Sequence, residues 1–267
     1  IRDSLESVGM VRRLRQSLRS ALSIIYAGYW WLVLALLAAM VWPTVMVLPR
    51  RAWRHYFIRA AVRLWFFLTG ITIQVRTQGG VAPCRAIIVS NHASYLDGGV
   101  LSVAIPGELT FIAKQEFAGQ FWAGRFLRRL GTLFVRRVDR VEGVKATEDI
   151  VGAVMAGERI VAFPEGTLLR RPGLLSFRLG AFAAACEAGV PIVPVAIRGT
   201  RTVLRGEQWF PRRASLSVEI GEPILPDGKG FEAAVRLRDS VRAWILDHCG
   251  EPDLGREEVD LAAWGQL

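Results

Sequence analysis

The chain has 267 residues, of which 52% are hydrophobic and 22% charged, so disordered, collagen-like and mini-protein classes are excluded. Three widely separated cysteines predict a reducing compartment, with neither a disulfide framework nor a structural zinc site. The net charge of +10 is unevenly distributed. Residues 1–85 hold 12 Lys and Arg against 2 Asp and Glu, whereas the remaining residues hold 22 of each.

The first part of the chain contains a long apolar run. Residues 20–49 carry no charged side chain, and residues 24–48 are almost wholly apolar. About 20 such residues are enough to cross a bilayer, and the run is too long for the core of a signal peptide. Pro43 and Pro49 are expected to break its far end.

Arginines flank this run on both sides, with four between residues 12 and 19 and five between residues 50 and 63. A spanning helix normally shows an excess of Lys and Arg on one side only. We therefore predict that residues 1–70 form a two-helix anchor in one leaflet, on the cytoplasmic face of the membrane. A single transmembrane span and a buried hairpin of a soluble protein are the alternatives.

The second predicted helix has an apolar face made of Trp53, Phe57, Ala60, Leu64 and Phe67. Arginines occupy much of the rest of this helix, which predicts contact with anionic lipid. Nucleic-acid binding is disfavoured, because the arginines border apolar sequence and the remaining chain is neutral.

From about residue 72 short apolar runs alternate with helical stretches. Strands are predicted at residues 86–90, 110–113, 132–135, 160–163, 192–197 and 216–220. This alternation predicts an α/β fold with a mixed, mostly parallel sheet flanked by helices. We expect the α/β domain to cover residues 71–250 and an acidic C-terminal tail to cover residues 251–267.

A histidine and an aspartate follow the predicted strand at residues 86–90. His92 stands at the strand end and Asp97 five residues later. If the chain turns between them, the carboxylate can hold one ring nitrogen and leave the other to accept a proton. No nucleophile motif such as Gly-x-Ser-x-Gly lies nearby, so the pair predicts a general base acting on a substrate hydroxyl. The structural alternative is a histidine that caps a loop.

Two other strand ends carry polar groups. Glu165 could accept a hydrogen bond from a polyol hydroxyl, while the backbone N–H groups of Gly166 and Thr167 could face an anion. Arg136 and Arg137 end another strand, and a guanidinium fork suits phosphate oxygens. Taken alone, each block also has an ordinary structural explanation.

In this order, the blocks from about residue 50 to residue 225 resemble the lysophosphatidic acid acyltransferase family, glycerolipid acyltransferases that use a thioester donor. The matches are N-H-x-x-x-x-D at Asn91, His92 and Asp97, the glycine-to-arginine block at 131–137, F-P-E-G-T at 163–167 and V-P-I-V-P at 190–194. The resemblance implies a glycerolipid acyltransferase fold with a membrane anchor. It also implies transfer of an acyl group from acyl-CoA or acyl carrier protein to 1-acyl-glycerol-3-phosphate, giving phosphatidic acid.

The resemblance implies a role for each matched residue. His92 would be the general base, oriented by Asp97. Arg137 would bind the acceptor phosphate with help from Lys114 or Arg136. The remaining matches would position the glycerol part (Glu165, Gly166 and, beside them, Thr167) and support the acyl-chain site (Pro191 and Pro194). No metal and no bound organic cofactor are implied, since the acyl donor is a substrate.

Three departures from the family pattern leave the acceptor open. Leu168 stands where many members have arginine, Arg136 where members often have aspartate, and Phe121 where they often have proline. Another lysophospholipid or a lyso-aminolipid is therefore an alternative acceptor, and a transacylase would use the same His–Asp chemistry. A non-catalytic membrane lipid-binding protein is the alternative from a different class, although a pure binder needs no base.

Overall fold

The computed structural model describes residues 2–79, 84–135, 140–205 and 208–255. These residues form one sheet of seven strands in the order β1-β7-β6-β2-β5-β3-β4. In chain order the strands are β1 (Thr72–Thr77), β2 (Ala86–Ser90), β3 (Thr110–Lys114), β4 (Leu133–Val135), β5 (Arg159–Ala162), β6 (Ile192–Arg198) and β7 (Ser215–Ile220). Every neighbouring pair is parallel except β6 and β7, so the expected mixed, mostly parallel sheet is confirmed.

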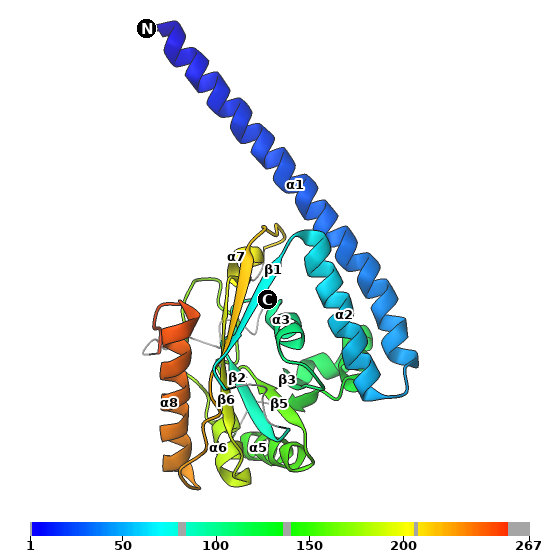
Figure 1. Ribbon diagram of the computed structural model, residues 1–267, viewed down its shortest axis with the longest axis vertical. Helices are drawn as coiled ribbons and strands as arrows, with labels where there is room; N and C mark the ends of the chain where they lie inside the picture. The colour runs from blue at the N-terminus through cyan, green and yellow to red at the C-terminus, as the bar shows by residue number, and fades with distance from the viewer. Residues whose placement is uncertain (1, 80–83, 136–139, 206–207, 256–267) are drawn as a thin grey trace.

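Helices cover both faces of this sheet (Figure 1). They are α1 (Arg2–Val47), α2 (Arg51–Thr69), α3 (Asp97–Ala104), α4 (Phe121–Arg129), α5 (Arg140–Met155), α6 (Gly180–Ala188), α7 (Thr200–Val203) and α8 (Phe231–Cys249), with a 3-10 turn at Gln115–Gly119. One apolar core lies on the side of α1, α2 and α3, and the other on the side of α5, α6 and α8. The central strand β2 is buried along its whole length, because both of its faces are covered.

The helices α1 and α2 form a hairpin beside the sheet, and the first part of α1 extends well beyond the α/β domain (Figure 1). Among the described residues, α1 supplies one stretch long and apolar enough to cross a membrane, Arg15–Val47. Pro43 lies inside α1, so the expected break at this residue is wrong. The helix continues past the missing N–H donor to Val47, and only Pro49 lies in the turn.

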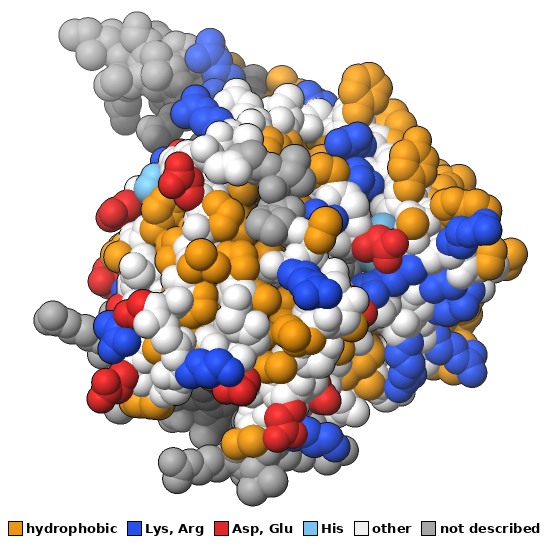
Figure 2. Space-filling model, turned by 60° about the horizontal axis from the view of Figure 1, so that its bottom comes forward, with side chains coloured by type: hydrophobic (Ala, Val, Ile, Leu, Met, Phe, Trp, Pro, Cys, Tyr) orange, Lys and Arg blue, Asp and Glu red, His pale blue; other side chains and the backbone are white. Residues whose placement is uncertain are grey.

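The predicted apolar face of α2 points away from the α/β domain. Phe67 is 80% exposed and Trp53 is also exposed, whereas Trp65 and Phe66 on the opposite face are buried. Figure 2 shows hydrophobic side chains gathered together with Lys and Arg along the right-hand edge of the molecule, the side on which Figure 1 places the α1–α2 hairpin. This edge therefore combines exposed apolar and basic surface.

Three arginines of α2 face the protein, so the expectation that they contact lipid is wrong. Arg54 is buried and donates to the carbonyl oxygens of Leu48 (2.7 Å), Pro49 (2.8 Å) and Arg129 (2.6 Å). In the same way Arg51 donates to the Leu130 carbonyl, and Arg59 donates to the carbonyls of Ser102, Ile105 and Gly107. Several of these carbonyls follow the ends of α3 and α4, where they lack helical partners and attract cations.

The segment expected to begin a tail packs on the domain. Leu174 donates its N–H to Pro252 and accepts one from Leu254, and Glu251 pairs with Arg201 at 2.9 Å. Residues 251–255 therefore belong to the folded α/β domain, whereas residues 256–267 lie outside the described residues.

Candidate active site

The turn between β2 and α3 brings His92 and Asp97 together. Nδ1 of His92 lies 2.9 Å from Oδ2 of Asp97, which also accepts the backbone N–H groups of Ala93 (2.7 Å) and Ser94 (2.9 Å). Asp97 is fully buried, and the imidazole is partly exposed. The carboxylate therefore fixes a proton on Nδ1 and leaves Nε2 as the basic nitrogen.

Asn91 and Ser94 attach this turn to neighbouring elements. The Asn91 amide donates to the Ile197 carbonyl (2.9 Å) and accepts the Ile197 N–H (2.8 Å), so its side chain prolongs the ladder between β2 and β6. The Ser94 hydroxyl donates to the Leu204 carbonyl at 2.7 Å. These partners lie more than a hundred residues along the chain, and the Asn–His motif by itself gives Asn91 no such role.

The turn after β5 lies directly against His92. The Phe163 ring stacks on the imidazole with centroids 4.2 Å apart. Oε1 of Glu165 accepts the backbone N–H of His92 (2.7 Å), and Oε2 accepts the N–H of Leu175 (2.9 Å). Because Glu165 is only 5% exposed, burial raises the pKa of its carboxyl to about 7, against the opposing effect of these two hydrogen bonds.

This geometry differs from what the sequence predicts for the F-P-E-G-T block. Glu165 stays a predicted acceptor of a polyol hydroxyl, and each of its oxygens also accepts one backbone N–H. The N–H of Gly166 was expected to face an anion, yet it donates to the Phe163 carbonyl at 3.1 Å. Thr167 is half-buried in the bend that follows. The Glu165 carboxylate and the Gly166 N–H therefore both bind backbone groups.

The expected phosphate-binding residues follow β3 and β4. Lys114 is exposed at the end of β3 and pairs in register with Val135 at the end of β4. Arg136 and Arg137 lie outside the described residues. In the sheet order, β4 and β3 are on the β5 side of β2 and β6 is on its other side.

The prolines expected to support an acyl site lie in the sheet. Pro194 is within β6, opposite Val89, and accepts the Gly221 N–H. Pro191 precedes β6 and accepts the Ile87 N–H near the start of β2, the end opposite to His92. Neither proline lines the two cavities that adjoin the His92 turn in the described structure.

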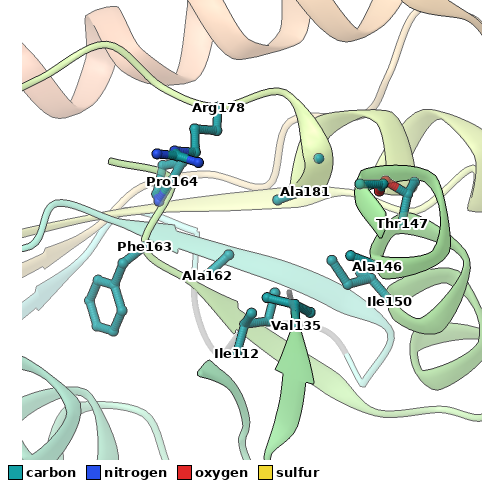
Figure 3. A pocket seen from close by; sticks show the side chains of 12 residues that line it. Ile112, Val135, Ala146, Thr147, Ile150, Ala162, Phe163, Pro164, Arg178 and Ala181 are labelled. Atoms are coloured by element: carbon teal, nitrogen blue, oxygen red, sulfur yellow. The ribbon is translucent and has the colours of Figure 1, made fainter. Parts of the chain in front are cut away.

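The first of these cavities, of about 260 Å³, lies on the α5–α6 side of the sheet (Figure 3). Apolar side chains of β3, β4 and α5 line it, together with Phe163 and Pro164, and Arg178 lies near Pro164 at one end. The second, of about 690 Å³, lies between the α1–α2 hairpin and the His92 turn. Its lining includes Trp30, Trp31, Trp65, Tyr95, Leu96 and Trp209.

The arrangement supplies a base with a carboxylate-fixed tautomer. One apolar cavity is lined by Tyr95 and Leu96 of the same turn, and the other by Phe163, whose ring stacks on the imidazole. Within the described residues no group of three His, Cys, Asp or Glu side chains could hold a metal ion. An imidazole held in this way can deprotonate a hydroxyl, and apolar cavities of this kind suit aliphatic chains.

Comparisons with known proteins identify similar acyltransferases. The Acyltransferase family model matches residues 72–198. The lyso-ornithine lipid O-acyltransferase of Brucella abortus is 33% identical over 269 residues, covering 84% of this chain and 96% of that protein. The 1-acyl-sn-glycerol-3-phosphate acyltransferase alpha of Mus musculus is 28% identical over 220 residues, covering 81% of this chain and 76% of that protein.

A solved structure shows the same fold. The 1-acyl-sn-glycerophosphate acyltransferase PlsC from Thermotoga maritima superimposes with a TM-score of 0.69 at 22% identity, covering 85% of this chain and 94% of that one.

Proposed function

The chain belongs to the lysophosphatidic acid acyltransferase family, and we propose that it transfers a fatty acyl group from a thioester donor to the free hydroxyl of 1-acyl-glycerol-3-phosphate. As a member of this family it is an acyltransferase that acts on lysophospholipid-like acceptors. The observation that supports base-catalysed transfer is the 2.9 Å contact between His92 Nδ1 and Asp97 Oδ2 at the end of β2, and the choice of acceptor is supported by the 1-acyl-sn-glycerol-3-phosphate acyltransferases among the relatives.

The proposed reaction begins at Nε2 of His92. This nitrogen takes the proton of the acceptor hydroxyl while the oxygen attacks the thioester carbonyl carbon. The tetrahedral adduct collapses, the carbon–sulfur bond breaks, and the imidazolium returns the proton to the leaving thiolate. The buried carboxylate of Asp97 stabilises the imidazolium in between. The products are an ester and a free thiol, and the sequence of steps needs no metal or bound cofactor.

The substrates are assigned to the two sides of His92. Arg137, with Lys114 or Arg136, would hold the acceptor phosphate at the β3–β4 end of the sheet. The two apolar cavities that adjoin the His92 turn would hold the aliphatic chains of donor and acceptor, since both substrates carry one. The position of the cavities and of β3 and β4 around β2 supports both assignments.

The α1–α2 hairpin is proposed as the membrane anchor, on the cytoplasmic face. Its outward surface carries exposed apolar residues, including Trp53, Tyr56 and Phe67, and basic residues lie beside them (Figure 2). Such a surface suits the interfacial region of a bilayer with anionic lipid. A lysolipid acceptor would then reach the active site from the leaflet in which the hairpin lies.

A second acceptor is supported by one specific comparison. The Brucella abortus lyso-ornithine lipid O-acyltransferase is matched over nearly its whole length, and at a higher identity than the Mus musculus glycerophosphate enzyme. Leu168 also departs from the arginine of many family members. A lyso-ornithine lipid is therefore the alternative acceptor, with unchanged chemistry at His92.

The test is an acyl-transfer assay on membranes that contain the full chain. Labelled acyl-CoA and acyl carrier protein are offered with 1-acyl-glycerol-3-phosphate, a lyso-ornithine lipid and other lysophospholipids. His92→Ala is the blank, and His248→Ala, at the end of α8, is the matched control. Transfer to 1-acyl-glycerol-3-phosphate above all others supports the proposal, and transfer to the lyso-ornithine lipid alone supports the alternative. Absence of any His92-dependent transfer contradicts both.

A further inference from the structure

A basic cavity lies at the carboxyl end of β6, outside the site described above. Its volume is about 440 Å³, and four arginines line it: Arg198, Arg201, Arg205 and Arg212. Glu251 is the one acidic residue among the described lining residues, and it already pairs with Arg201 at 2.9 Å. The described lining residues of the cavity therefore carry an excess of positive charge.

This cavity lies on the β6 side of β2, away from β4. The strand β6 is the neighbour of β2, and Asn91 hydrogen-bonds with Ile197, one residue before Arg198. Arg201 donates to the carbonyl of Leu169, two residues after the F-P-E-G-T block. The arginines thus follow β6, on one side of β2, whereas Lys114 of the predicted acceptor phosphate site ends β3, on the other side.

The four guanidinium groups differ in how many hydrogen bonds and ion pairs they form within the protein. Arg198 donates to the His248 carbonyl, and Arg201 is held by Glu251 and Leu169. The side chains of Arg205 and Arg212 are exposed and form no hydrogen bond or ion pair with the described part of the chain. Among the described residues, these are two guanidinium groups whose geometry matches phosphate oxygens and which have no protein partner.

An exposed aromatic ring stands beside these forks. Phe210 is 60% exposed and lines this cavity together with Arg212. Both residues also line an adjoining cavity that adds Arg19 and Arg213. Arginines with an exposed ring form a surface on which a nucleotide can place its phosphates and stack its base. The volume of about 440 Å³ is within the range of small-molecule sites.

We propose that this arginine-lined cavity binds the nucleotide phosphates of a CoA thioester, so that the donor enters from the β6 side. The inference rests on the proposed function, and it names CoA as the donor. Two phosphate-bearing substrates must meet at one imidazole, and basic groups on opposite sides of β2 keep their charges apart. An anionic lipid headgroup would also offer phosphate oxygens to the arginines, but it has no nucleotide base that could stack on the Phe210 ring.

The test uses the full chain with the double variant Arg205→Ala/Arg212→Ala. We expect KM for acyl-CoA to rise roughly tenfold or more, as loss of charge-assisted hydrogen bonds predicts, with KM for the lysolipid unchanged. An acyl-pantetheine thioester, which has no nucleotide, should react equally well with variant and wild type. Arg76→Ala/Arg85→Ala removes the same charge from exposed positions that line neither basic cavity and should leave both KM values unchanged.

Other outcomes would overturn the inference. A rise in KM for the lysolipid alone would assign the cavity to the acceptor. Weaker flotation with anionic vesicles at unchanged KM for acyl-CoA would assign it to a lipid headgroup. Transfer from acyl carrier protein only would exclude CoA while leaving the proposed function intact. Equilibrium dialysis with labelled CoA gives a readout independent of turnover, and equal binding by the double variant and wild type would contradict the site.

Discussion

Oε1 of Glu165 lies 2.7 Å from the backbone nitrogen of His92, so a carboxylate 73 residues away holds the main chain of the proposed base. Its second oxygen holds the N–H of Leu175. One buried side chain thereby joins the turn after β2, the turn after β5 and the loop before α6. In our proposal Glu165 is a positioning residue that acts through His92.

Glu165→Gln is expected to lower kcat without raising KM for the acceptor. The amide keeps the shape of the side chain, but its NH₂ group must face one of two N–H donors, so one hydrogen bond is lost. Stability should fall by about 1–3 kcal/mol. Steady-state kinetics with a varied lysolipid check this result. A raised KM at unchanged kcat would show instead that Glu165 contacts the acceptor.

The same variant should change how stability depends on pH. Burial raises the pKa of the Glu165 carboxyl to about 7 from its ordinary 4.5. Between these values the folded protein holds a proton that the unfolded chain has lost, so this group's contribution to stability falls as pH rises. Thermal unfolding between pH 4.5 and 7 should show this fall in wild type and a flatter profile in Glu165→Gln. Parallel profiles would contradict the assignment.

Asp97→Asn should reduce transfer by about 100- to 10,000-fold. Oδ2 of Asp97 accepts three N–H groups, and an amide can neither stabilise the imidazolium nor keep the correct tautomer with the same strength. Initial rates on membranes check this expectation, with Asp239→Asn, on the exposed side of α8, as the control. Activity near the wild-type rate would remove Asp97 from the proposed mechanism.

Arg54→Ala should destabilise the docking of α2 on the α/β domain. The buried guanidinium donates to three carbonyl oxygens, which would be left without this partner. We expect the free energy of unfolding to fall by roughly 3 kcal/mol. Arg54→Lys should restore only part of this loss, because lysine lacks the planar guanidinium that donates to several carbonyls at once. Arg63→Ala, at an exposed position of the same helix, is the matched control for denaturant unfolding in detergent.

Phe67→Glu should weaken membrane association. The Phe67 side chain is 80% exposed on the outward face of α2, and burial of such a side chain contributes about 1.5–3 kcal/mol. The bound fraction in vesicle flotation should fall accordingly. Val144→Glu places the same charge at an exposed apolar position of α5 and should have no effect. Equal flotation of the two variants would argue against the hairpin as the anchor.

Much of the fold could be predicted because its signals are local. The strand β2 is a continuous apolar run, buried on both faces, and its observed bounds are the predicted ones. The edge strand β1 was missed as a strand, since most of its residues are exposed and show no alternation. His92 and Asp97 were paired correctly because five residues and one turn separate them.

The partners of Arg54 and Glu165 could not be predicted in this way. Residue type indicated lipid for the arginine and a substrate hydroxyl for the carboxylate, but each side chain meets backbone groups that lie far away in sequence.

The amino-acid sequence by itself determined the family, the mixed sheet and the His–Asp pair, since apolar runs and short motifs encode them within a few residues. Only the tertiary structure decided which polar groups hold the fold and which are left for substrates. A buried donor or acceptor must be satisfied by whatever group the packing brings within reach. In this packing Glu165 and Arg54 form hydrogen bonds with backbone groups, whereas Arg205 and Arg212 remain exposed.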